Sequence, residues 1–152
     1  MTASAALAFL HHAAAFVLVA ALVVELVLLR GELTVTYARS LLRMDAAYGL
    51  SATILLIVGF LRVFYTEKGS DYYFASGPFI VKISLFVIIG LLSIYPTVQF
   101  LRWRPALRQN QVPVLDAGLR RTLRTIIHIE LSAVFVIILC AALMARGIGY
   151  LG

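Results

Sequence analysis

Four long apolar stretches dominate this chain of 152 residues and constrain its fold more than any other feature. They cover about residues 5–29, 45–65, 78–101 and 122–145. Each has the ~20 residues that a helix needs to cross a hydrocarbon core. None shows the alternation of apolar and polar residues that is typical of a strand in a membrane barrel. Because backbone groups in lipid must bond within their own segment, the stretches predict helices. With 62% hydrophobic and 13% charged residues, residues 1–152 are predicted to form one all-α domain, an integral membrane bundle of four transmembrane helices.

Basic residues are distributed unevenly between the loops at the two ends of the predicted bundle. Nine arginines follow the first and third spans: Arg30, Arg39, Arg43, Arg102, Arg104, Arg108, Arg120, Arg121 and Arg124. Only Lys68 and Arg146 belong to the opposite side. By the positive-inside rule, this bias predicts a multi-pass protein with both termini outside and the arginine-rich loops in the cytoplasm. Attraction to anionic headgroups then accounts for the net charge of +6, so no nucleic-acid partner is expected.

Ionisable residues within the predicted spans fall into two layers, and the layer nearer the cytoplasm carries both signs of charge. This inner layer comprises Glu25, Asp45, His128 and Glu130, and arginines surround it. Two interpretations are open. Salt bridges would fix the packing of the helices, because removal of one partner would leave a buried charge unpaired. Alternatively, Glu25, His128 and Glu130 would relay protons, because carboxyl and imidazole groups can exchange them.

The outer layer consists of His11, His12, Arg62 and Lys82, with no carboxylate at the same depth. Arg62 and Lys82 taken singly would extend their charged ends to the interface. Neighbouring positions on a helix point about 100° apart, so at least one of the two histidines faces the bundle, and which one is open. An inward imidazole beside two cations suits haem, whose iron takes imidazole and whose propionates take the cations. A copper or zinc ion fits less well, because the cations repel it and no thiolate or carboxylate completes its ligand set.

Four short features follow one another along the first three spans. Leu10-His11-His12 opens the first span and Leu29-Arg30 closes it, Gly59 lies late in the second, and Ile80-Val81-Lys82-Ile83 opens the third. In this order they resemble the HemJ-like membrane proteins, which are distantly related to CopD-type membrane domains. The tract from Tyr72 to Thr97 is similar, more specifically, to a bacterial family of uncharacterised predicted membrane proteins, and this resemblance implies a multi-pass protein of the bacterial cytoplasmic (inner) membrane. The HemJ-like resemblance implies haem b as cofactor and oxidation of protoporphyrinogen as activity, with one of the two histidines and the lysine as functional residues.

Together with this resemblance, these residues predict a membrane protein that binds haem b and acts as a haem-dependent oxidoreductase or an electron-transfer protein. A non-catalytic scaffold or assembly protein is a second hypothesis, because small residues along the spans permit close helix contact. A small proton-coupled transporter that uses the inner layer is a third. The expected partners are the lipid bilayer, a quinone or porphyrin molecule, and a second copy of the chain as a homodimer, since four helices around a cofactor have little core to spare.

Overall fold

Every regular element in the described part of the protein is a helix. The computed structural model describes residues 3–66 and 76–149. Its elements are α1 (Ala3–Leu28), α2 (Val35–Leu61), η1 (Arg62–Thr66), α4 (Gly77–Arg102), α5 (Arg104–Arg108) and α6 (Ala117–Ala145). The short π-helix η1 continues α2. Four segments of these residues are long and apolar enough to cross a membrane, namely α1, α2 with η1, α4 with α5, and α6. The predicted all-α bundle of four membrane helices is thereby confirmed.

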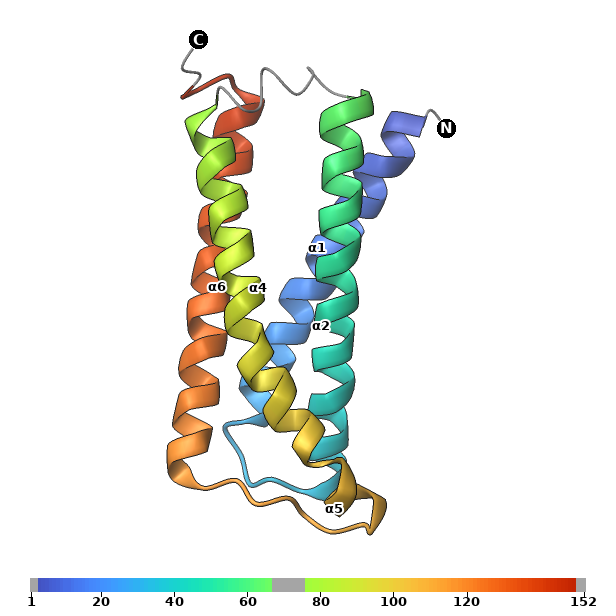
Figure 1. Cartoon of the computed structure of the whole chain (residues 1–152), viewed down its shortest axis with the longest axis vertical. Coiled ribbons are helices and arrows are strands. Elements are labelled where there is room, and N and C mark those ends of the chain that lie inside the picture. Colours follow the sequence, from blue (N-terminus) through green and yellow to red (C-terminus); the bar gives the residue numbers. More distant parts are fainter. Residues whose placement is uncertain (1–2, 67–75, 150–152) are drawn as a thin grey trace.

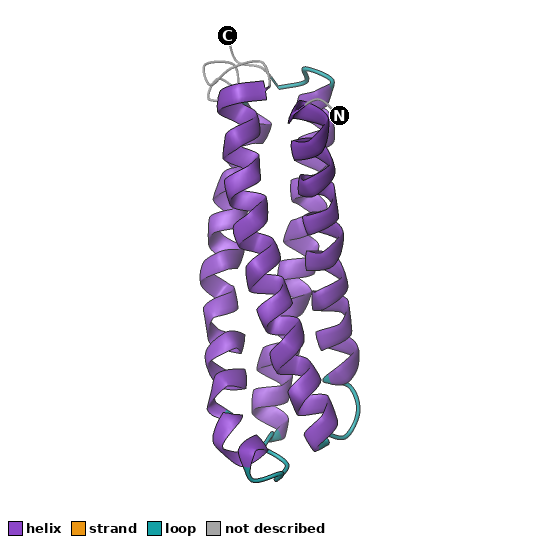
Figure 2. Cartoon of the chain, turned by 90° about the vertical axis from the view of Figure 1, so that its right-hand side faces the viewer, coloured by secondary structure: helices purple, strands orange, loops and turns teal. Residues whose placement is uncertain are grey.

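The four long helices form two pairs. α1 packs along α2 and α4 packs along α6, while the two pairs contact each other less extensively (Figure 1). We call the end where α1 begins and α6 ends the terminal end, and the end with residues 29–34 and 109–116 the arginine end. A view turned by 90° shows the long helices following one common axis (Figure 2). Lys68, which belongs to the charge bias, and Tyr72, which begins the tract of resemblance, lie outside the described residues.

The main hydrophobic core joins the two pairs in the half of the bundle nearer the arginine end. Each long helix contributes at least one almost fully buried side chain, exemplified by Leu22, Leu41, Phe100 and Ile127. The lipid-facing surfaces are also apolar, so burial rather than hydrophobicity distinguishes the core in this protein. The pairs are therefore held together mainly at one end.

α2 begins earlier than its apolar stretch predicts. It starts at Val35 rather than near residue 45, because the hydroxyl oxygen of Thr34 accepts a hydrogen bond from the N–H of Tyr37 at 3.1 Å and caps the helix. An apolar stretch marks only the part of a helix that lies in hydrocarbon, so it does not reveal the polar first turns. Arg39 therefore lies on a helix and not in a loop.

α6 shows the same difference at its start. It begins at Ala117 rather than near residue 122, and the carboxylate of Asp116 caps it by accepting the N–H of Leu119 at 2.8 Å. Three of the arginines that the charge pattern assigns to this loop, Arg120, Arg121 and Arg124, consequently lie on the first turns of α6. Their side chains share helix faces instead of pointing freely into water.

Arginines at the arginine end bind the backbone of neighbouring helix ends. Arg39 donates to the carbonyl oxygen of Leu107 at 3.1 Å. Arg120 donates to the carbonyl oxygen of Leu29 at 3.0 Å and also to that of Gly31. The last carbonyls of a helix have no partner within the helix, and cations are favourable there. These two arginines thus connect the helix pairs through the ends of α1 and α5.

Candidate functional site

A cleft of about 460 Å³ lies between the helix pairs, in the half of the bundle nearer the terminal end. All four long helices line it, mostly with apolar side chains. The main core lies at its inner end, and a smaller buried cluster that includes Val63 and Phe79 lies at its terminal end. His11, His12 and Lys82 contribute its ionisable groups, and no carboxylate of the described residues lines it. Three of the four residues of the outer layer, His11, His12 and Lys82, therefore line a cavity.

His11 is the histidine that faces the bundle. Its half-buried ring lies against α2, where a Cβ atom added to Gly59 would be 3.6 Å from the His11 Cε1 atom. Arg62 and Lys82 lie close enough for their charges to act on this imidazole. Its Nδ1 atom is buried and has no hydrogen-bond partner among the residues that the structure describes. The fold thus brings three of the predicted site residues together around a buried ring nitrogen.

His12 lies at the exposed rim of the same cleft. Its ring meets that of His11 edge-on, with 6.1 Å between the ring centroids and an interplanar angle of 81°. The Nδ1 atom of His12 lies 2.6 Å from the carbonyl oxygen of Ala8, one turn earlier on α1. This hydrogen bond places the ring proton on Nδ1 and leaves the lone pair on Nε2. Metal-bound histidines commonly donate their other ring N–H to a carbonyl in this way.

Lys82 completes the polar wall of the cleft, and Arg62 lies near this lysine without lining the cleft itself. Lys82 is half-buried, and its Nζ atom lies 5.2 Å from the centre of the Phe79 ring, within the range of a cation–π interaction. Arg62 begins η1 and is near enough to Lys82 for the two charges to repel each other. The carboxylates of Glu67 and Asp71, which follow the second span in the sequence, lie outside the described residues. Like charges close together in an apolar cleft favour an anionic ligand between or beside them.

Three carboxyl groups of the inner layer converge within the main core. Glu25 is 2% exposed and Glu130 is 1% exposed, and the charge of Asp45 acts on both. Asp45 is half-buried and accepts a hydrogen bond from the hydroxyl of Thr97 at 2.7 Å. His128 does not join this group, because it is exposed and lies two residues from Glu130, on another face of α6. The predicted set of four is therefore divided into a carboxyl cluster and a separate histidine.

The salt bridges expected of the inner layer are absent from the described residues. One side-chain oxygen of Glu25 and one of Glu130 are buried without a hydrogen-bond partner there. No basic side chain in this part of the chain pairs with either carboxyl group. Arg120 illustrates the reason, since its guanidinium group reaches the carbonyls at the end of α1 instead. Helix packing here depends on the apolar core and not on ion pairs.

Residues 3–149 match the profile of a family described as "Predicted membrane protein (DUF2214)". The chain belongs to this family. The predicted similarity to a family of predicted membrane proteins is thereby confirmed. No curated protein and no solved structure matches the chain. The DUF2214 description names no cofactor, ligand or activity.

Two further residues of this DUF2214 protein belong to the carboxyl cluster and were not predicted from the sequence. Tyr48 is 5% exposed, and the charges of the three carboxyl groups of the cluster act on its hydroxyl group. It follows Asp45 by one helical turn, so the helical period could have placed it on the same face of α2. Thr97 carries no comparable signal, because its contact with Asp45 joins two different helices.

We expect the Glu130→Gln variant of this DUF2214 protein to unfold close to the wild-type temperature. The amide keeps the shape of the carboxyl group and breaks no ion pair of the described residues, so the cost should stay below about 1 kcal/mol. A buried salt bridge at this place would instead make the loss cost about 3–5 kcal/mol. Thermal unfolding in detergent, followed by circular dichroism, measures the difference. Glu32→Gln, at an exposed loop position, is the matched control. A large decrease of the unfolding temperature in Glu130→Gln but not in Glu32→Gln would contradict the expectation.

Proposed function

We propose that the cleft binds haem b or a related porphyrin, and that the protein acts as a haem-dependent oxidoreductase or electron-transfer protein of the membrane. The observation that carries this proposal is the set of groups around His11. Two imidazoles lie beside Lys82 and close to Arg62, and no carboxylate of the described residues lines the cavity. A ligand that joins a metal ion to acidic groups satisfies both kinds of side chain, whereas a lipid tail satisfies neither.

The dimensions and the lining of the cleft fit such a ligand. Its volume of about 460 Å³ falls within the ~300–1,000 Å³ that small-molecule sites occupy, and its apolar walls suit a macrocycle. The buried Nδ1 atom of His11, which lacks a partner among the described residues, is a polar group that a ligand can satisfy. A bare metal ion fits less well, since no group of three or more His, Cys, Asp or Glu in the described residues could hold one.

Each polar side chain has a separate role in this proposal. The Nε2 atom of His12 is the nitrogen for the iron, because the carbonyl of Ala8 orients the ring through Nδ1. Lys82 and Arg62 hold the acidic groups through charge-assisted hydrogen bonds, and His11 offers them a further donor or acceptor. Haem supplies one-electron transfer when bound, and the apolar walls keep water away from it.

The resemblance to HemJ-like proteins supports the same class of ligand. It assigns functional importance to a histidine of the first helix and a lysine of the third, and in this chain such residues line one cleft as His12 and Lys82. A quinone is the less suitable small molecule, because it has no acidic groups to neutralise Lys82 and Arg62.

Titration of the purified protein with haemin tests the proposal. We expect a shifted Soret band that saturates at a single haemin per chain, because the two imidazoles line one cleft. The dimethyl ester of haemin, in which both acidic groups are blocked, is the matched control ligand. It should bind at least about tenfold more weakly, since it cannot pair with the two cations. A preparation without a Soret shift after addition of haemin, or with equal affinity for the two ligands, would contradict the proposal.

A further inference from the structure

A second cavity lies along the first turns of α6, at the arginine end of the bundle. Its volume is about 450 Å³, and its lining residues all fall within residues 115–128. Most of its polar groups are basic side chains: Arg120, Arg121, Arg124 and His128. No carboxylate of the described part of the chain lines this pocket, which we call the basic pocket.

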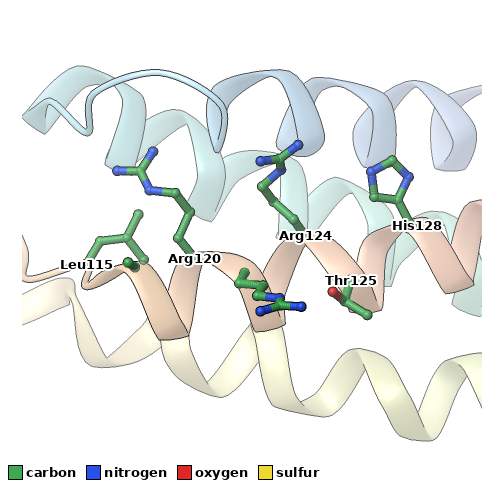
Figure 3. Close-up of a pocket in the computed structure, with 7 residues that line it drawn as sticks. Leu115, Arg120, Arg124, Thr125 and His128 are labelled. Atoms are coloured by element: carbon green, nitrogen blue, oxygen red, sulfur yellow. The ribbon is translucent and has the colours of Figure 1, made fainter.

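Helical spacing explains why these groups meet in the basic pocket. Arg120, Arg124 and His128 follow one another at intervals of four residues, so they stand on one face of α6. Figure 3 shows the three side chains projecting from the same side of the helix, with Leu115 at one end of the row. The row extends for ~12 Å along the helix axis at the usual helical rise. A ligand can therefore contact several donors at once.

The arginines of the basic pocket differ in what they already bind. Arg120 donates to the carbonyl oxygens of Leu29 and Gly31, so some of its hydrogen-bond donors already stabilise the contact between α6 and the end of α1. Arg124 is half-buried, and its Nε atom is buried without a hydrogen-bond partner among the described residues. A buried donor without an acceptor costs free energy. An anion in the pocket can accept hydrogen bonds from the guanidinium group of Arg124, which lines it.

We propose that the basic pocket binds the phosphate group of an anionic phospholipid. Guanidinium groups match phosphate oxygens in geometry and charge, and basic pockets on membrane helices bind such headgroups. The helix face that bears the pocket continues to an exposed apolar surface at Leu139, against which an acyl chain can lie. A soluble phosphate would use the arginines and leave this surface unused. The proposal concerns the end of the bundle opposite the haem cleft and does not depend on it.

Short-chain phosphatidylglycerol, added to the purified protein in a neutral detergent, tests this proposal. We expect this lipid to raise the midpoint of thermal unfolding, and an equal concentration of zwitterionic short-chain phosphatidylcholine to leave it unchanged. The Arg121→Gln/Arg124→Gln double variant should bind phosphatidylglycerol on the order of thirtyfold more weakly, the loss expected for two arginines near a headgroup. Arg120 is left in place because of its bonds to the end of α1.

The matched control is the Arg102→Gln/Arg104→Gln double variant, which removes the same charge from exposed positions near the arginine end outside the basic pocket. It should keep the wild-type affinity. An equal loss of affinity for phosphatidylglycerol in both double variants would contradict the proposal. It would mean that the lipid is attracted to the positive charge of the arginine end in general and not to the basic pocket. Inorganic phosphate should neither stabilise the protein nor displace the lipid at equal concentration. If inorganic phosphate stabilised the protein and phosphatidylglycerol had no effect, the pocket would bind free phosphate and not a phospholipid, and the proposal would be wrong.

Discussion

Replacing His12 by alanine is expected to remove the nitrogen that coordinates haem iron and to lower the affinity for haemin by at least about tenfold. Even the loss of an outer partner of a metal-bound histidine costs about 10- to 100-fold in affinity, so loss of the ligand itself should cost no less. The carbonyl of Ala8, 2.6 Å from Nδ1, orients the ring of His12 and leaves Nε2 available. His11→Ala should weaken binding less and should keep the coordination spectrum.

Absorption spectra of the haemin complexes distinguish the two variants. The Soret band of the His12→Ala complex should move toward that of haemin without a protein nitrogen ligand. Free imidazole should restore the wild-type position, because the small base can enter the space that the side chain leaves. Loss of the wild-type spectrum in His11→Ala alone would assign the iron to His11 instead. Wild-type spectra in both variants would contradict any role of these histidines as iron ligands.

The number and type of the long helices could be predicted from the sequence, because the bilayer imposes nearly the same length on every span. The helix ends could not be predicted in this way. α2 begins at Val35 because Thr34 caps it, in a polar region where hydropathy carries no information. The early start of α6 at Ala117 also bears on the proposed lipid site, because it places Arg120 and Arg121 of the basic pocket on this helix.

The depth of a polar residue could also be predicted, but its direction around the helix could not. The helical rise alone assigns His11 and Lys82 to one level of the membrane. Whether His11 or His12 faces the bundle depends on the side that α1 turns toward α2, and the contact of His11 with Gly59 decides it. That contact joins residues far apart in the sequence, so no local pattern reveals it.

The inner layer shows the same difference between depth and direction. His128 and Glu130 lie at similar depth, yet one is exposed and the other is 1% exposed. Opposite charges at one depth suggest salt bridges, but an arginine near a helix end can also bind backbone carbonyls, as Arg39 does at Leu107. The sequence contains no signal that separates these two uses of a guanidinium group.

We expect Phe100→Ala to lower the free energy of unfolding by about 3–5 kcal/mol, the usual cost of removing a buried phenylalanine side chain. Phe100 is 0% exposed in the main core, and its ring lies 5.2 Å from that of Trp103 at an angle of 58°. The substitution leaves a cavity in the core that joins the helix pairs. It also removes an aromatic contact, which accounts for about 0.5–1.5 kcal/mol of such a loss.

Phe9→Ala is the matched control, because Phe9 is 70% exposed on α1 and belongs to no buried cluster of the described residues. Its cost should stay within about 0.5 kcal/mol. Denaturant unfolding in detergent, analysed at equal m-values, measures both variants. Equal losses of unfolding free energy in the two variants would mean that contacts with the detergent hold the helix pairs together as strongly as the core does. A loss confined to Phe100→Ala would instead place the stability at the arginine end, so that the cleft at the terminal end can remain open to a ligand without unfolding the bundle.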